Sequence, residues 1–415
     1  MAKWMESGPM ALELGQGQGR RVMRGVAAVI LAATVAALSG CGSFFVYPGS
    51  GTTTTTSGDY VYVSNSPTGI TYINGYSIAN GTLAATSGSP VNVNVVPSAM
   101  AITPNNNLLY IASSGGTTGT GNGLYAYVIG SAGALTAENS GGAMAGGYPV
   151  SIDISPDGQW LFALDGLSNT ISEYSINYTS GALSLTNQLT FAATGGANIT
   201  AYQIRVAPTG SYVVAAVGDA GEIVIPLTTS SGALGSTYGI TTVNVGSGSD
   251  YAVTMDGSNN LYVARTGGTT ATTGVYVYAL GSTAATLVSS TPGLTGAGPK
   301  SIVLSSGYNY LYTGNETDTT LQTAGGTISE FSQSSAKLTS LGVAILSPVE
   351  VYSMGRDNSG NYILAAGYNS TSNGLILYSI GSAGALTQAS AVTTAAPVPN
   401  GAGLPTYPAV MALTH

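Results

Sequence analysis

The residue types that most often carry catalysis and metal binding are scarce in this chain. Its 415 residues include one cysteine, Cys41, and one histidine, the terminal His415. A lone cysteine cannot form an internal disulfide, and one cysteine with one histidine cannot build a Cys/His metal cluster. Any mechanism that uses an internal histidine as general base is likewise excluded.

Carboxylates and cations remain as candidates for acid–base and electrostatic chemistry. Asp165, Glu222 and Arg265 are the residues that a lactone or ester hydrolase with a rearranged site could use. Such a reaction needs a base for the attacking water and a cation or donor set for the developing oxyanion. These three are therefore the candidate catalytic residues.

A second group of polar residues recurs at intervals near 50. Tyr202, Asp250, Lys300 and Tyr352 each lie eleven residues before an apolar dyad of the repeats described below. We expect them in one half of a channel mouth, where they could hold a small polar ligand such as a sugar. The alternative is the ordinary polar lining of a wet channel.

Two further pairs of charged residues have more than one interpretation. Asp153 and Arg205 each lie eight residues before a dyad. Either they pair between adjacent repeats or Arg205 anchors an anionic ligand, and pairing is favoured because a buried arginine seldom lacks a carboxylate partner. Glu316 and Asp318 could form half of a Ca²⁺ site, but calcium needs about six to eight oxygens. We predict no metal and no cofactor.

The charge balance limits the kinds of partner. Charged residues make up 6% of the chain, and fifteen acidic residues against five basic ones follow Cys41. Nucleic acids and anionic lipid surfaces both attract clustered lysine and arginine. We therefore expect no nucleic-acid partner and no direct electrostatic binding to a lipid surface. A monomer that binds a small polar ligand, a glycan or an envelope protein is the expectation.

The first 40 residues are typical of a lipoprotein signal peptide. Arginines within 20–24 precede the apolar run 26–38, which is too short for a membrane span. The following Leu-Ser-Gly-Cys ends at Cys41 and resembles the bacterial lipobox. This resemblance implies cleavage before Cys41 and lipidation of its thiol, and so an exported protein.

The segment 41–58 has several glycines and serines and no apolar periodicity. It is predicted to be a flexible tether between the lipid anchor and the domain at 59–415. Gly42 follows the cysteine, so by resemblance to enterobacterial sorting we expect the outer membrane. Translation could start at Met1 or at Met23.

Two landmarks recur seven times at a period near 50. The first is an apolar dyad in a β-rich run: Val61-Tyr62, Leu109-Tyr110, Leu161-Phe162, Val213-Val214, Leu261-Tyr262, Leu311-Tyr312 and Ile363-Leu364. The second begins 19 to 25 residues after the start of each dyad: Gly81-Thr82-Leu83, Gly133-Ala134-Leu135, Gly181-Ala182-Leu183, Gly232-Ala233-Leu234, Ala285-Thr286-Leu287, Ala336-Lys337-Leu338 and Gly384-Ala385-Leu386. Two independent landmarks agree on seven units.

The repeats predict an all-β fold, a single seven-bladed β-propeller of four-stranded antiparallel blades over 59–415. The unit 149–189 alternates as four strands with a turn at 156–158. Before Val61 the first strand of a unit is missing, and 407–413 resembles such a strand with no dyad after it. The C-terminal strand is therefore expected to pair into the N-terminal blade and close the ring.

The repeats resemble those of a known family. Tyr60-Val61-Tyr62-Val63-Ser64-Asn65, Leu261-Tyr262-Val263-Ala264-Arg265 and the turn Ser155-Pro156-Asp157-Gly158 are similar to the YVTN-type repeats of the seven-bladed lactonase family, which includes 6-phosphogluconolactonase-like proteins. The resemblance spans about 59–415 and implies a propeller.

The same resemblance implies less about catalysis. Members thought to open lactones carry a Pro-His-x-His-type segment, but the corresponding stretch 149–152 has no histidine. Ala201-Tyr202-Gln203 stands in place of the family's Pro-Arg-His segment. The glutamate that follows this segment in the family corresponds to a position near Gly218 in this chain. At Asp165 the chain has a polar residue where the family pattern also has one. The resemblance thus implies a fold more strongly than a lactonase reaction.

Three functions remain open. The first is a non-catalytic binding or scaffold propeller at the cell envelope, favoured by intact repeats without the family's catalytic residues. The second is a lactone or ester hydrolase with a rearranged site. The third is a structural role in a surface layer, which suits a Thr/Ser/Gly-rich chain with few charges.

Overall fold

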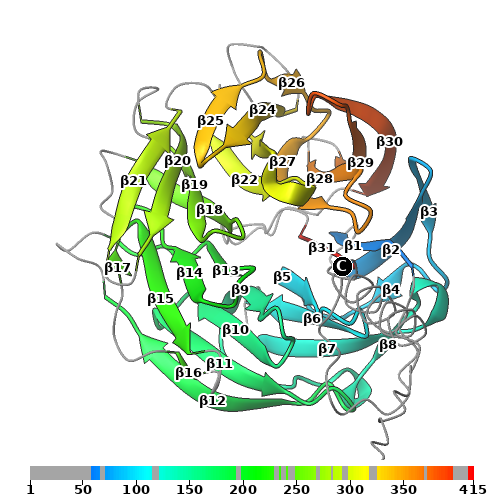
Figure 1. Ribbon diagram of the computed structural model, residues 1–415. Helices are drawn as coiled ribbons and strands as arrows, with labels where there is room; N and C mark the ends of the chain where they lie inside the picture. Colours follow the sequence, from blue (N-terminus) through cyan, green and yellow to red (C-terminus); the bar gives the residue numbers. More distant parts are fainter. Residues whose placement is uncertain are drawn as a thin grey trace, which may run out of the picture. The chain divides into compact units, whose positions relative to one another are not determined.

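The chain runs through seven antiparallel sheets arranged in a ring, as Figure 1 shows. The computed structural model describes residues 58–65, 71–114, 121–192, 198–228, 233–234, 240–241, 248–267, 272–281, 284–291, 298–316, 325–368, 372–395 and 410–415. These residues belong to one compact unit, Thr54–His415. The expected signal peptide and most of the expected tether, with Cys41, lie outside the described residues.

The first four blades take up the N-terminal half of the ring. Blade 1 holds β1 (Tyr60–Asn65), β2 (Tyr72–Ala79), β3 (Thr82–Ala85), β4 (Val91–Asn92) and the last strand, β31 (Met411–Leu413). Blade 2 holds β5 (Pro97–Ile102), β6 (Leu108–Ser113), β7 (Gly123–Ile129) and β8 (Leu135–Ala137), with the 3₁₀ turns η1 (Ser131–Gly133) and η2 (Asn139–Gly141). Blade 3 holds β9 (Pro149–Ile154), β10 (Trp160–Asp165), β11 (Thr170–Ile176) and β12 (Leu183–Thr190). Blade 4 holds β13 (Gln203–Val206), β14 (Tyr212–Ala216), β15 (Glu222–Thr228), β16 (Ala233–Leu234) and β17 (Ile240–Thr241).

The remaining three blades follow in chain order. Blade 5 holds β18 (Ser249–Met255), β19 (Asn260–Thr266), β20 (Gly274–Leu280) and β21 (Ala285–Ser290). Blade 6 holds β22 (Pro299–Leu304), η4 (Ser306–Tyr308), β23 (Tyr310–Asn315), β24 (Thr327–Ser334), β25 (Lys337–Ser340) and β26 (Ile345–Leu346). Blade 7 holds β27 (Glu350–Arg356), β28 (Tyr362–Tyr368), β29 (Ser372–Ile380) and β30 (Leu386–Ala395).

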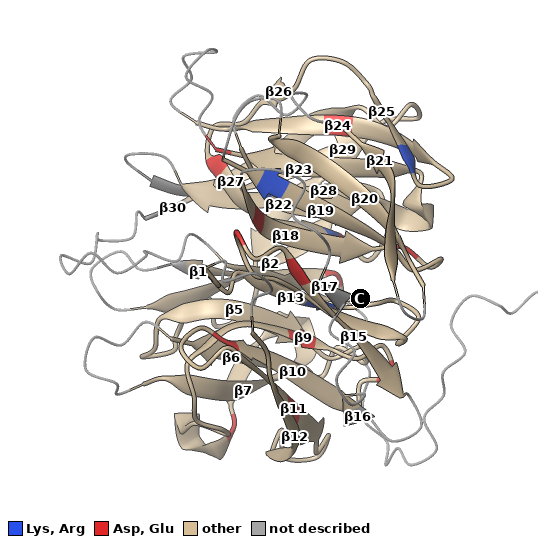
Figure 2. Ribbon diagram, turned by 90° about the vertical axis from the view of Figure 1, so that its left-hand side faces the viewer, with Lys and Arg blue, Asp and Glu red and all other residues tan. Residues whose placement is uncertain are grey.

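Burial explains why the apolar dyads recur in the sequence. Each dyad lies in the second strand of its blade, and the dyad residues Leu109 and Tyr110 have no exposed surface. This strand packs against a neighbouring blade on both faces, so both faces must be apolar. The fourth strand forms the rim, and β12 is mostly exposed. Rim strands use serine and threonine, and charged residues are few and scattered along the ribbon (Figure 2).

The core is divided among the blade boundaries. The described residues form seven apolar clusters, one between each pair of neighbouring blades. The innermost strands also contact one another in an unbroken ring, in the order β31, β5, β9, β13, β18, β22, β27 and back to β31. The predicted seven-bladed propeller is therefore confirmed.

The C-terminal strand closes the ring, as the sequence predicted. β31 pairs antiparallel with β1, with Val61 opposite Leu413 and Val63 opposite Met411. The Tyr60 amide donates to the Thr414 hydroxyl at 2.8 Å. The final residue reaches blade 2, where the His415 backbone amide donates to Asn106 Oδ1 at 2.8 Å and Asn106 Nδ2 donates back to the His415 carbonyl at 2.9 Å.

The two repeated landmarks of the sequence meet across the blade boundaries. The Tyr312 hydroxyl in β23 donates to the Gly384 carbonyl at 2.7 Å, where Gly384 begins the Gly-Ala-Leu turn of blade 7. The same bond recurs for Tyr62 with Gly133 at 2.9 Å and Tyr110 with Gly181 at 3.0 Å. Three of the four dyad tyrosines thus hold the turn of the next blade, whereas the Tyr262 hydroxyl bonds Asp256 and Gln333.

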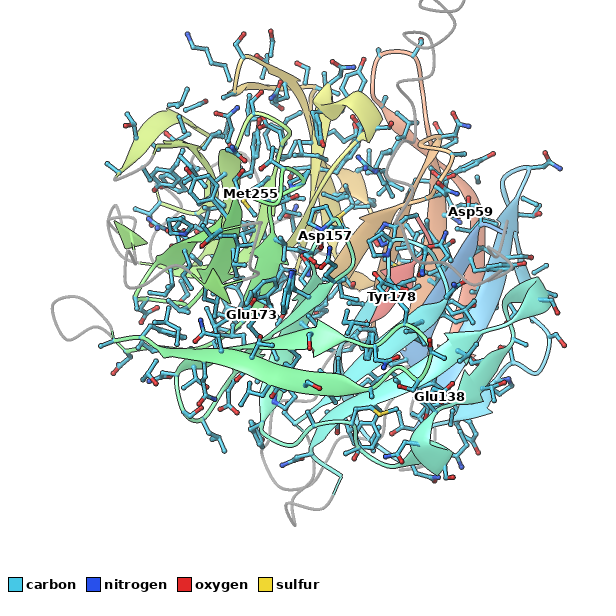
Figure 3. The ribbon with its side chains drawn as sticks, turned by 60° about the horizontal axis from the view of Figure 1, so that its bottom comes forward. Asp59, Glu138, Asp157, Glu173, Tyr178 and Met255 are labelled. Atoms are coloured by element: carbon cyan, nitrogen blue, oxygen red, sulfur yellow. The ribbon has the colours of Figure 1, made fainter. Side chains whose placement is uncertain are left out.

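A buried glutamate holds the same turn at a second point. The Leu386 amide donates to Glu330 Oε1 at 2.7 Å, and the Leu234 amide donates to Glu173 Oε2 at 3.1 Å. Figure 3 labels Glu173, which lies on β11 of blade 3. Burial raises the pKa of both glutamates above the ordinary value, although the leucine amides oppose this shift.

Candidate functional site

The innermost strands begin with a β-bulge, which decides the side chains presented at that end of the ring. In β22 the register passes from Pro299 to Ser301, which leaves Lys300 as the extra residue. Tyr352 is the extra residue in β27, and Tyr251 is the extra residue in β18. A bulge re-aims its unpaired side chain. We call this end of the ring the mouth face.

The prediction that Asp250 lies at the mouth is wrong. The count of eleven residues from the dyad fails in blade 5 because the turn between β18 and β19 is one residue shorter. Leu261 lies opposite Met255, six residues away, whereas Leu311 lies opposite Leu304, seven residues away. The position therefore passes to Tyr251, and Asp250 points into the interior.

Four residues form a continuous group at the mouth face, and one of them, Tyr251, was not predicted from the sequence. The rings of Tyr202 and Tyr251 stack with centroids 4.1 Å apart. Lys300 Nζ lies 3.2 Å from the centroid of the Tyr251 ring and 3.1 Å from Glu316 Oε1. Burial lowers the pKa of Lys300 below its ordinary value, although Glu316 opposes this shift. Tyr202 and Lys300 are thus brought together as predicted.

Tyr352 extends this group into blade 7. Its hydroxyl donates to Glu350 Oε2 at 2.9 Å, and its ring stacks on Tyr368 with centroids 5.2 Å apart and an interplanar angle of 10°. Glu350 also acts electrostatically on Lys300. We define the mouth belt as Tyr202, Tyr251, Lys300, Glu316, Glu350 and Tyr352.

A second polar group lies buried between blades 4 and 5. Arg265 and Asp250 have no exposed side-chain surface, and their ion pair is bidentate, with N–O distances of 2.6 and 2.7 Å. The Arg265 guanidinium also lies 4.7 Å from the centroid of the Tyr276 ring. This geometry consumes the Asp250 carboxylate and removes Arg265 from solvent.

Glu222 belongs to the same group and is fully buried. Burial first, and then the charge of the Asp250 carboxylate, raise the pKa of Glu222 well above its ordinary value. Both oxygens of Glu222, Arg265 Nη1 and the Tyr278 hydroxyl are buried without a hydrogen-bond partner among the described residues. Burial thus favours the protonated form of the Glu222 carboxyl, which can donate a hydrogen bond to Asp250. We call Glu222, Asp250, Arg265 and Tyr278 the ionic cluster.

The third candidate catalytic residue, Asp165, has a structural role. Oδ1 accepts the amides of Leu167 and Ser168 at 2.9 and 2.8 Å, and Oδ2 accepts the Tyr148 amide at 2.8 Å. Burial alone would raise its pKa, but the bonds from Ser168, Tyr148 and Leu167 lower it below the ordinary value. Asp165 therefore stabilises the turn after β10.

Asp153 and Arg205 are near neighbours across the boundary of blades 3 and 4, but they form no direct ion pair. Asp153 Oδ2 accepts the Val206 amide at 2.8 Å, and Arg205 Nη1 donates to the Ile204 carbonyl at 3.2 Å. Burial raises the pKa of Asp153, and the charge of Arg205 opposes this shift. The predicted pairing of Asp153 with Arg205 is therefore wrong, and Asp153 instead links the two blades through the Val206 backbone amide.

The remaining candidates concern metals and membranes. Glu316 pairs with Lys300, and Asp318 lies outside the described residues. Where the chain is described, three His, Cys, Asp or Glu side chains nowhere gather closely enough to hold a metal ion. The same part of the chain contains no helix with the length and hydropathy of a membrane span.

The blade order and the repeats can be compared with known families. The family model described as "Lactonase, 7-bladed beta-propeller" matches residues 68–200 and 260–403, about two thirds of the chain. The chain belongs to the seven-bladed β-propeller lactonase family. The stretch 201–259, between the two matched segments, contains Tyr202, Glu222 and Asp250. The chain thus departs from the family model where the mouth belt and the ionic cluster begin.

Solved structures of the same fold include two Bacteroides proteins. A putative 6-phosphogluconolactonase from Bacteroides uniformis superposes with a TM-score of 0.65 at 16% identity, covering 82% of this chain and 98% of its own. One from Bacteroides fragilis gives 0.66 at 15%, covering 88% and 100%. The periplasmic gluconolactonase of Pseudomonas aeruginosa gives 0.58 at 15%, covering 82% and 98%. No curated protein matches the chain.

Sequence reasoning missed Tyr251, Glu350 and Tyr368. A signal for Tyr251 was present, because the turn Asp256–Asn259 lacks the additional residue found in the other first turns. Glu350 begins β27 two residues before Tyr352, and Tyr368 ends the strand paired with it. These two residues could be found only once the strand register was known.

Proposed function

We propose that this member of the lactonase family is a non-catalytic binding propeller, which holds a small polar ligand or a glycan at the mouth belt and is displayed at the cell envelope. The observation that carries the proposal is the chain of contacts from the Tyr202–Tyr251 stack through Lys300 to Glu316. It places aromatic faces, a cation and a carboxylate, all partly exposed, at one end of the ring.

The positions of the candidate catalytic residues support binding over hydrolysis. Hydrolysis needs a base that reaches water and donors that reach the oxyanion. Glu222 and Arg265 have no exposed surface, and the oxygens of Asp165 accept three backbone amides. Residues 149–152, which correspond to the family's histidine-rich segment, contain no histidine.

The alternative is a lactone or ester hydrolase with a rearranged site. Membership of the lactonase family favours it, and the Pseudomonas aeruginosa neighbour is a periplasmic gluconolactonase by name. Such an enzyme would have to open the boundary between blades 4 and 5, because Glu222, Asp250 and Arg265 lie behind it.

Turnover measurements separate the two functions. We expect the purified full chain in detergent to hydrolyse 6-phosphogluconolactone and gluconolactone no faster than the spontaneous rate, because Glu222 and Arg265 are fully buried and the oxygens of Asp165 accept three backbone amides. Lys300→Met and Arg205→Ala serve as matched variants, with thermal unfolding as the check on folding. Clear turnover by the wild type that either folded variant abolishes would establish the hydrolase and refute the proposal.

A further inference from the structure

We infer that the ligand of the mouth belt is a sugar without phosphate or carboxylate groups, either neutral or bearing an ammonium group. The inference rests on the proposed function and adds the ligand's charge class. The described mouth face of blades 4 to 7 carries three acidic side chains, Asp219, Glu316 and Glu350, against the single cation Lys300. Asp219 contacts the Ser249 hydroxyl and acts electrostatically on Tyr202.

The positive charge of Lys300 is already engaged. Its side chain is 9% exposed, with Glu316 Oε1 at 3.1 Å and the Tyr251 ring centroid at 3.2 Å. Arg265 is fully buried in its bidentate pair with Asp250. A phosphate or carboxylate arriving at this face would meet three acidic groups and would have to draw Lys300 away from Glu316. Sugar acids and sugar phosphates are therefore disfavoured.

The same groups suit a sugar ring that lacks a negative charge. The tyrosine stacks on blades 4, 5 and 7 offer faces for the C–H side of a pyranose, and the carboxylates of Glu316 and Glu350 accept hydroxyl or ammonium hydrogens.

The test uses the full chain in detergent and sugars that differ in charge. An array of neutral, amino, uronic-acid and sulfated oligosaccharides is followed by calorimetric titration with trimers of N-acetylglucosamine and of glucosamine, a glucuronate-containing tetrasaccharide, and 6-phosphogluconate. We expect the first two to bind at least about tenfold more tightly than the last two. Added salt should weaken only the glucosamine trimer, because its attraction to the carboxylates is screened.

Substitutions in the mouth belt test whether it causes the preference for neutral and amino sugars over acidic ones. Glu350→Gln and Glu316→Gln should each weaken the glucosamine trimer about three- to tenfold and affect the N-acetylglucosamine trimer less. Glu138→Gln makes the same change in blade 2, which contributes no residue to the belt, and should alter neither affinity; Glu138 is labelled in Figure 3. Thermal unfolding confirms that each variant is folded.

The outcomes distinguish failure of the proposed charge class from failure of the proposed binding function. Tighter binding of the acidic sugars, lost in Tyr251→Ala, would overturn the charge class and leave the proposed binding function standing. No binding to any array member, or binding that folded Tyr251→Ala and Glu350→Gln variants retain unchanged, would overturn both.

Discussion

The hydroxyl of Tyr312 is a single group on which the contact between blades 6 and 7 depends. It donates to the Gly384 carbonyl at 2.7 Å in a buried bond. Tyr312→Phe should lower the free energy of unfolding by about 1–3 kcal/mol, because the carbonyl remains buried without its donor. Urea unfolding followed by circular dichroism measures the change.

Tyr310 provides the matched control, two residues away on the same strand. Its hydroxyl donates to the Ser382 carbonyl at 3.2 Å in an exposed bond. Tyr310→Phe should cost less than about 0.5 kcal/mol, because water can replace the lost donor. Equal losses in the two variants would show that the buried bond contributes nothing particular to the ring.

Glu222 should make the stability of the propeller depend on pH. Its pKa is raised in the folded protein, so between the unfolded and folded pKa values the unfolded chain releases a proton that the native state keeps. Stability from this group is full below the unfolded pKa and falls as pH rises toward the folded pKa, by up to about 1.4 kcal/mol per pH unit.

Glu222→Gln removes this titration. The difference in unfolding free energy between the variant and the wild type should shift in favour of the variant as pH rises from 5 to 9, measured by urea unfolding at each pH. Glu138→Gln, partly exposed in blade 2, should leave the wild-type profile unchanged. A difference that stays constant with pH would mean that Glu222 ionises normally.

The last strand of the chain is the element on which closure depends. Deletion of residues 407–415 removes β31, whose Met411 and Ala412 are buried, and exposes the edge of β1. We expect a loss of about 3 kcal/mol or more, in the range of large-to-small changes at a buried methionine, and association through the free edge. Thermal unfolding and size-exclusion chromatography measure the two effects.

A milder variant separates closure from the contact of the final residue. Asn106→Ala removes the two bonds to His415 and leaves the pairing of β31 with β1 intact. It should lower stability less than the deletion and keep the protein monomeric. If the truncated chain kept the melting temperature and monomeric state of the wild type, the strand would not be needed for closure.

Elements were more predictable from the sequence than the site. The dyads recur because they lie in the buried second strand of each blade. The Gly-Ala-Leu turns recur because their glycine carbonyl accepts a hydrogen bond from a tyrosine of the preceding blade, as Gly384 does from Tyr312. Such packing constraints act on residue type and spacing, so they can be read directly. Closure by the last strand could be predicted because the sequence lacks a first strand before Val61 and has one extra strand at its C-terminal end.

The site depends on features that spacing does not encode. Lys300 and Tyr352 reach the mouth because each is the extra residue of a bulge, and a turn one residue shorter exchanges Asp250 for Tyr251. A shift of one residue reverses the face to which a side chain points. Glu222, Asp250 and Arg265 are also brought together across two blades, and no local pattern predicts that contact.

The whole molecule combines a closed ring with very little charge. Five basic residues follow Cys41, of which Arg265 is fully buried and Lys300 is paired with Glu316. The propeller surface therefore offers little to anionic lipids, which attract clustered basic residues. We expect any attachment to a membrane to occur through the N-terminal segment, which the described residues do not include.

We predict that Cys41 is the lipidated first residue of the mature protein, because the single cysteine closely follows the signal-like apolar run at 26–38. Each buried methylene contributes about 0.8 kcal/mol, so one acyl chain binds marginally, and the two or three chains that the lipobox resemblance implies would make attachment effectively permanent. Mass spectrometry of the membrane-extracted protein should find an acylated Cys41. Cys41→Ser should move the protein from the membrane fraction to the soluble fraction without changing the melting temperature of the propeller. An unmodified peptide spanning Gly40 and Cys41 in the mature protein would contradict lipidation, and membrane retention of Cys41→Ser would indicate another mode of attachment.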